Sequence, residues 1–128
     1  MTIRFRAADV HIELTGAHVL LGLGSGGSEP DQHIIMMRAL GDAPGVADVL
    51  TADTYFEYRG QAHAGYGCVT RAVLTPSSLT LGCDTRRCPQ LPDGDFEVEL
   101  DSSAGRHDAI AAVLRALIDG PRLVIKDA

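Results

Sequence analysis

Cationic side chains are scarce in this sequence. Its 11 basic residues include a single lysine, Lys126, and they never form a run. Nucleic-acid binding draws on clustered Lys and Arg side chains that neutralise phosphates, so the composition argues against a nucleic-acid partner. The 17 acidic residues bring the formal net charge to -6, which favours a basic partner instead.

Long apolar runs are also absent. The stretches Val19 to Leu21 and Ile34 to Met37 are far too short to span a bilayer. The first residues interleave Arg4 and Arg6 with apolar side chains, which is not the pattern of a secretory signal peptide. We therefore expect no membrane association and a cytoplasmic location.

Cysteine is rare, and its count is odd. Cys68, Cys83 and Cys88 cannot all pair within one chain, which argues against a secreted disulfide framework, so we expect three thiols. A zinc site that combines these cysteines with His63 is conceivable, but no second closely spaced Cys or His pair completes four ligands. Core thiols are the simpler interpretation, and we predict no metal and no cofactor.

Recognisable catalytic motifs are missing as well. The five histidines are scattered singly, and no G-x-S-x-G motif surrounds a nucleophile. Distant residues can still converge in a fold, so the sequence weakens catalysis without excluding it. We predict a protein that is not an enzyme and has no catalytic residues.

What is present indicates one packed domain spanning residues 1–128. This length is usual for one domain, and 45% hydrophobic with 22% charged residues is close to a globular average. Most of the chain alternates apolar with polar residues, which is the period of a half-buried strand. Strands are predicted at residues 3–7, 10–14, 17–23, 54–59, 66–74, 79–83 and 96–100, with an edge strand at 123–125.

Local signals set the predicted connections. The alternation slips at Ala8-Asp9, where a bulge or bend would put both apolar sets on one face. Thr15-Gly16 would turn the chain into a first hairpin, and Gly60 to Gly65 would join the strands 54–59 and 66–74 in a second. The predicted loops are residues 24–31 and 84–94.

Residues 33–40 are ambiguous, because Ile34 to Met37 suits a short buried strand or a turn of helix; we favour a strand. A helix that Ser102 or Ser103 can cap follows the strand 96–100. Its apolar residues recur at helical spacing: Ile110, Val113, Leu114, Leu117 and Ile118. The predicted fold is α+β, a mostly antiparallel sheet of about six to eight strands covered by one helix near the C-terminus.

Three glycines have the spacing of a phosphate-binding loop. Gly22, Gly24 and Gly27 fit G-x-G-x-x-G after an apolar strand. The context is wrong, because Glu29 and Asp31 would then lie where a phosphate belongs, at the start of a helix. We keep a small-ligand-binding domain or enzyme that uses the loop 22–28 as the alternative hypothesis.

Two groups of residues are candidates for binding a partner. The strand period projects the carboxylates of Asp95, Glu97, Glu99 and Asp101 onto one face, about 7 Å apart. This row is either a solvated face or a docking surface for a basic partner. The second group is the aromatic set Tyr55, Tyr58 and Tyr66, which either anchors a partner or fills the core.

Several of these segments together resemble the immunity protein 10 family of bacterial polymorphic toxin systems. The resemblance runs from about His33 to Leu117. It rests on five segments: His33 to Leu40, an apolar strand that carries Arg38; the aromatic Asp53 to Glu57; Gln61 to Gly67 with its Ala64-Gly65-Tyr66-Gly67 turn; Leu79 to Cys83; and Phe96 to Leu100 before a helix.

The resemblance implies a non-enzymatic cytoplasmic protein that binds and neutralises a cognate toxin domain. The mechanism would be occlusion of the toxin's active surface by complementary shape and charge. The family offers no catalytic residues to carry over. A homo-oligomer, with edge strands paired between chains, stays open.

Overall fold

The computed structural model describes residues 2–16, 18–26, 32–39, 54–92, 94–100, 106–118 and 120–126. Within them the chain forms two five-stranded sheets, one α-helix and two short 3₁₀ turns, η1 (Gln61–His63) and η2 (Gly120–Arg122). Sheet A has the strand order β1 (Ile3–Ala7), β9 (Phe96–Leu100), β8 (Ser78–Cys83), β7 (Val69–Leu74) and β10 (Leu123–Ile125). Sheet B has the order β2 (Asp9–Leu14), β3 (His18–Gly24), β4 (His33–Ala39), β5 (Tyr55–Tyr58) and β6 (Ala64–Tyr66).

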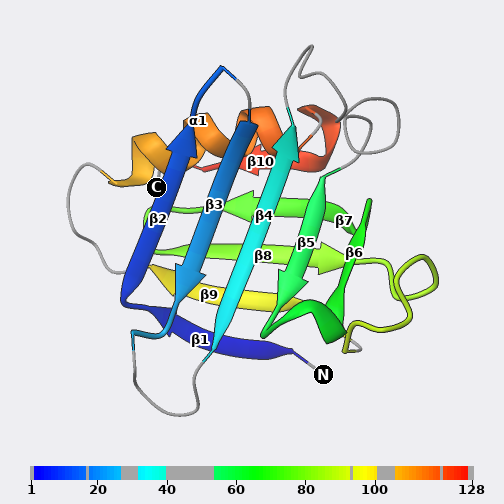
Figure 1. Ribbon diagram of the computed structural model, residues 1–128. Coiled ribbons are helices and arrows are strands. Elements are labelled where there is room, and N and C mark those ends of the chain that lie inside the picture. Colours follow the sequence, from blue (N-terminus) through cyan, green and yellow to red (C-terminus); the bar gives the residue numbers. More distant parts are fainter. Residues whose placement is uncertain are drawn as a thin grey trace.

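The two sheets lie face to face, and their strands run crosswise in Figure 1. All neighbours in sheet B are antiparallel. In sheet A, the first and last strands pair in parallel, β1 with β9 and β10 with β7. The α+β class and the mostly antiparallel pairing are confirmed. Of the ambiguous segment 33–40, His33–Ala39 form strand β4, and Leu123–Ile125 form an edge strand, β10.

The prediction of one sheet of six to eight strands was wrong in its layout. Alternation shows which residues of a strand are buried, but it does not show which sheet the strand joins. The slip at Ala8 marks the point where the chain leaves β1 of sheet A and enters β2 of sheet B. Ile3 and Phe5 of sheet A and Val10 and Ile12 of sheet B pack against the core, whereas Leu14 at the end of β2 is 58% exposed.

The second predicted hairpin also needs a correction. β5 pairs with the three-residue strand β6, and β7 belongs to the other sheet. The chain changes sheets at Gly67, whose φ of +67° is a conformation that side-chain-bearing residues rarely adopt. The strand predicted at 66–74 is therefore divided between two sheets.

Helix α1 (Arg106–Leu117) lies between β9 and β10 in the chain and covers the part of sheet B that sheet A leaves open. It contacts β2, β3 and β4 of sheet B, and also β10, beside which it lies in Figure 1. The predicted apolar stripe is buried: Ile110, Val113, Leu114, Leu117 and Ile118. The proposed caps, Ser102 and Ser103, lie outside the described residues.

The core lies between the inner faces of the sheets and under the helix. Phe96 of sheet A is fully buried, and its ring centroid lies 5.3 Å from that of Phe56 and 5.0 Å from that of Tyr58, both in sheet B. With its inner face committed to this core, each sheet has one outer face left for a partner.

Candidate functional site

The acidic row lies on the outer face of sheet A, but it is not purely acidic. Parallel pairing with β1 places Arg4 opposite Glu97 and Arg6 opposite Glu99. The Nε atom of Arg4 lies 3.3 Å from the Oε2 atom of Glu97. Glu97 and Glu99 thus form a mixed-charge ladder with β1, and cross-strand pairs of opposite charge need no external cation. Asp95 precedes β9, and Asp101 lies outside the described residues.

The three tyrosines do not share a face. Tyr58 is only 6% exposed and packs on Phe96, and its hydroxyl donates a hydrogen bond to Oε1 of Gln32. Tyr55 and Tyr66 lie side by side on the outer face of sheet B, with ring centroids 5.2 Å apart. The structure thus brings together two of the three predicted aromatic residues.

The tyrosine pair extends into a row that crosses sheet B. The register places Leu20 opposite Met37, Met37 opposite Tyr55, and Tyr55 opposite Tyr66. Met37 is 38% exposed and Tyr66 41%. We call Leu20, Met37, Tyr55 and Tyr66 the apolar row. Side chains of this kind are the usual centre of a protein interface.

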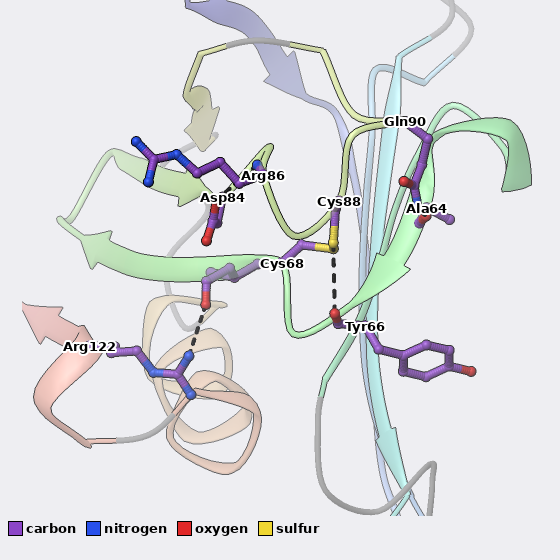
Figure 2. The surroundings of a disulfide bond; sticks show 9 residues. Ala64, Tyr66, Cys68, Asp84, Arg86, Cys88, Gln90 and Arg122 are labelled. Carbon is purple, nitrogen blue, oxygen red and sulfur yellow. Dashed lines mark hydrogen bonds between the residues drawn. A yellow bond between two sulfur atoms is a disulfide. The ribbon is translucent and has the colours of Figure 1, made fainter.

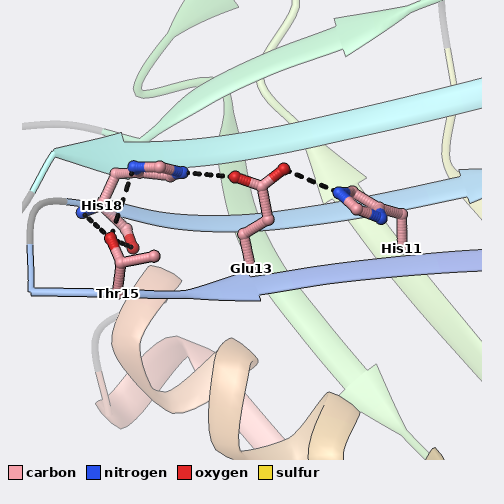
Figure 3. A network of polar contacts seen from close by, with 4 residues as sticks. All are labelled: His11, Glu13, Thr15 and His18. Atoms are coloured by element: carbon pink, nitrogen blue, oxygen red, sulfur yellow. Dashed lines mark hydrogen bonds and ion pairs between the residues drawn. The ribbon is translucent and has the colours of Figure 1, made fainter.

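A histidine–carboxylate network borders the apolar row at β2. Figure 3 shows Glu13 between two histidines: its Oε2 atom lies 2.7 Å from Nε2 of His11, and its Oε1 atom lies 2.6 Å from Nε2 of His18. These hydrogen bonds, first that of His11 and then that of His18, hold the pKa of Glu13 below its ordinary value of 4.5. The network fixes one negative charge beside Leu20, with which Glu13 is in register.

This network predicts an acid-sensitive contribution to stability. Because the folded state lowers the pKa of Glu13, its carboxylate stabilises the fold above pH 4.5, and this stabilisation is lost as the pH falls through the lowered pKa. We expect Glu13→Gln to lose stability at pH 7 and to lose less than wild type on going to pH 3. Urea titrations at the two pH values measure this. Glu99→Gln, which removes one charge from the other sheet, is the control, and equal pH dependence of wild type and Glu13→Gln would contradict the prediction.

A second carboxylate lies beside the apolar row in β5. The hydroxyl of Tyr55 donates a hydrogen bond of 2.7 Å to Oε1 of Glu57, and Nε2 of His33 lies 3.9 Å from its Oε2 atom. Burial and then this hydrogen bond raise the pKa of Tyr55 to about 12. Tyr55 is therefore a fixed phenol donor at neutral pH, held in place by Glu57.

The glycines of the G-x-G-x-x-G spacing are not in a phosphate loop. Gly22 and Gly24 lie within β3, which is hydrogen-bonded to β2 on one side and to β4 on the other. Gly27 lies outside the described residues. Above the two glycines the outer face of sheet B has an open hollow of about 220 Å³, with Asp9, His11, His33 and Ile35 among the lining residues.

The expectation of three thiols was wrong, because Cys68 and Cys88 form a disulfide. It links the start of β7 to the loop between β8 and β9, next to strand β6 (Figure 2). Gly65 of β6 makes room for it, since a Cβ atom there would lie 2.8 Å from the Sγ atom of Cys88 and 2.9 Å from that of Cys68. No sequence pattern showed that these two of the three cysteines meet.

Cys83 is the remaining free cysteine. Burial, and then the carboxylate of Asp95, raise the pKa of its thiol to about 12, so it is a weak nucleophile and a weak metal ligand at neutral pH. Among the residues that the structure describes, no three His, Cys, Asp or Glu side chains are grouped as a metal site would require.

Comparison with known protein families shows which family the chain belongs to, which the fold alone does not. The family model described as Immunity protein 10 matches residues 5–108, which is most of the chain. The chain belongs to the Immunity protein 10 family. Among curated proteins, the comparison finds no match to this chain.

The match changes the extent of the resemblance seen in the sequence. The Immunity protein 10 pattern begins at Phe5, so it includes β2, β3 and the glycine-containing segment that follows. It ends at Asp108 in the first turn of α1. The three strands that line the hollow, β2, β3 and β4, and all four residues of the apolar row thus lie within the family pattern.

Membership of the Immunity protein 10 family implies an immunity role, and with it a toxin as the partner rather than a catalysed reaction. In the part of the chain that the structure describes, no helix is long and apolar enough to cross a membrane.

Proposed function

We propose that this immunity protein binds a cognate toxin domain through the outer face of sheet B and neutralises it by covering its active surface. The observation that carries the proposal is the apolar row, which crosses four strands of one sheet with Met37 and Tyr66 well exposed. Large apolar and aromatic side chains in the centre of a polar surround are typical of tight interfaces.

The charges around the apolar row support a basic partner. Glu13 lies at one end of the row and Glu57 beside Tyr55, and the whole chain has a formal net charge of -6. Complementary charge speeds encounter and orients the partner, whereas the apolar centre slows dissociation. We infer that the toxin presents a basic surface around an apolar patch.

The test is the affinity of the toxin domain for variants of the apolar row. Tyr66→Ala is expected to weaken binding by about 30-fold or more, since the loss of an aromatic anchor costs about 2 kcal/mol. Calorimetry on the purified pair measures this, and growth of cells that express both proteins reports neutralisation. Val124→Ala is the matched control, because Val124 is 42% exposed but lies on β10 of sheet A.

The same affinity measurement shows which of the two outer faces binds the toxin domain. Glu97→Lys combined with Glu99→Lys reverses the charges on the sheet A ladder, where Arg4 and Arg6 already lie alongside. If the ladder were the docking surface, this double variant would lose binding and Tyr66→Ala would not. That result would move the proposed interface to sheet A.

A further inference from the structure

Two glycines in β3 have no evident role in the fold. Glycine weakens a strand, because it loses the most backbone freedom on folding and offers no side chain to pack. A Cβ atom at Gly22 would lie 3.5 Å from the Cβ atom of His11, and at Gly24 it would lie 3.9 Å from the backbone oxygen of Gln32. Both are ordinary contacts. Neither glycine has a positive φ, in contrast to Gly67.

Gly65, by contrast, is a glycine that the packing of the fold requires. A Cβ atom there would come within 3.0 Å of both disulfide sulfurs, so the residue must be glycine for internal reasons. Gly22 and Gly24 face open space on the outer side of an interior strand. Glycine in that position commonly marks a site where another molecule approaches closely.

The glycines form the floor of the hollow, and their neighbours form its walls. One row of the sheet runs His11, Gly22, Ile35, and the next runs Asp9, Gly24, His33. The hollow of about 220 Å³ is thus floored by strand backbone and walled by Ile35 and two imidazoles. It has room for one long side chain of a partner.

The charges at the rim select the kind of side chain. Asp9 lies at one side of the hollow, and Glu57 is in register with Ile35 at the other. Arg59, whose backbone N–H donates to the carbonyl of His33, is a cation at this end of the sheet, but these two carboxylates and that of Glu13 outnumber it. A long basic side chain lays its aliphatic stem on apolar surface and keeps its charge near carboxylates.

We propose that the hollow over Gly22 and Gly24 receives an arginine or lysine side chain of the toxin. This inference rests on the proposed function and names the contact that orients the apolar row on its partner. The stem lies on the glycine backbone and Ile35, and the charged head reaches Asp9 or Glu57. Glycine at position 22 is what keeps this space open.

Blocked amino acids test the hollow without the toxin. The probe is N-acetyl-arginine methylamide, followed by the backbone amide signals of Gly22 and Gly24 in NMR spectra. We expect saturable shifts in the millimolar range with arginine and at least threefold weaker binding with blocked citrulline, which has nearly the same shape but no charge. Equal binding of citrulline, tighter binding of blocked phenylalanine, or no shift with any probe would each overturn the assignment.

Filling the hollow is the second arm. Gly22→Val adds a β-branched side chain to a strand, so the melting temperature is expected to equal or exceed that of wild type. The arginine shifts should disappear, and affinity for the toxin domain should fall at least tenfold. Gly16→Val is the control, because a Cβ atom at Gly16 meets nothing within 4 Å and Gly16 lies outside the hollow.

The two arms separate this inference from the proposed function. If wild type and Gly22→Val bind the toxin domain equally, the hollow is not a contact, although the immunity role stands. If wild type does not bind the toxin domain, the proposed function fails, and the arginine titration still decides what the hollow accepts.

Discussion

Reduction of the Cys68–Cys88 disulfide is expected to lower the free energy of unfolding by about 3 kcal/mol. The bridge closes a loop of 20 residues, and in the chain-entropy account a loop of this length removes about that much freedom from the unfolded state. It also holds the β8–β9 loop next to β6, to which Gln90 of that loop donates a hydrogen bond at the carbonyl of Ala64 (Figure 2). We therefore expect the edge of sheet B beside Tyr66 to loosen first.

Urea unfolding with and without a phosphine reductant measures this effect. The double variant Cys68→Ala/Cys88→Ala is the control, and its stability should not respond to the reductant. Alkylation of the unfolded protein, taken directly from its source cells, should find one free thiol, that of Cys83. Three free thiols and identical unfolding curves would show that the bridge does not form in the cell or adds nothing.

The disulfide also bears on where the protein works. Stable disulfides are usual in oxidising compartments and rare in a reducing cytoplasm. The expectation of a cytoplasmic location came from an odd cysteine count and an N-terminal segment without a signal pattern. The bridge is at odds with a reducing compartment, so the thiol count above tests whether it forms in the cell, and the cytoplasmic location stays a prediction.

Replacing Phe96 by alanine is expected to cost about 3–5 kcal/mol, the largest single effect that we predict. The ring is fully buried and lies against Phe56 and Tyr58, so it joins the inner faces of the two sheets. Alanine would leave a cavity at the point where the sheets cross. Because domains are stable by only about 5–15 kcal/mol, a large part of the total would be lost.

Urea denaturation followed by circular dichroism measures the loss, and Phe96→Leu provides a milder variant if the alanine protein does not fold. Leu14→Ala is the control, since Leu14 is 58% exposed and its truncation should change stability by about 0.5 kcal/mol or less. A loss below about 1 kcal/mol for Phe96→Ala would mean that Phe96 does not join the sheets as described.

Local pattern was enough to locate most elements of this fold, but not to assemble them. The perfect alternation of Phe96, Val98 and Leu100 and the helical spacing from Ile110 to Ile118 led to β9 and α1. Which strands pair is decided by contacts between residues far apart in the chain, such as Ile3 with Phe96. No periodicity within one segment carries that information.

The composition of the candidate site was likewise hidden from patterns within a single segment. Glu97 and Glu99 form an acidic row in the sequence, yet their neighbours across the sheet are Arg4 and Arg6, more than ninety positions away. The period of two did hold evidence about the tyrosines, because Tyr55 and Tyr58 are three residues apart and must face opposite sides of one strand.

The apolar row was hidden for a different reason. Met37 belongs to Ile34-Ile35-Met36-Met37, which is apolar at every position. Such a run is typical of a strand buried on both faces, so no pattern distinguished the exposed Met37 from the buried Met36. Only the register with Tyr55 on the outer face revealed the row.

The two sheets also differ in how far apart their paired strands lie in the chain, and therefore in when each sheet can form during synthesis. The strands of sheet B lie between Asp9 and Tyr66, and each strand from β3 to β6 pairs with the strand that precedes it in the chain. Sheet A joins β1 to β9 and β7 to β10, so it needs both ends of the chain. Pairing between near neighbours closes short loops and forms quickly. The face that we assign to the toxin is thus encoded in a stretch of nascent chain that is finished before half of sheet A has been translated.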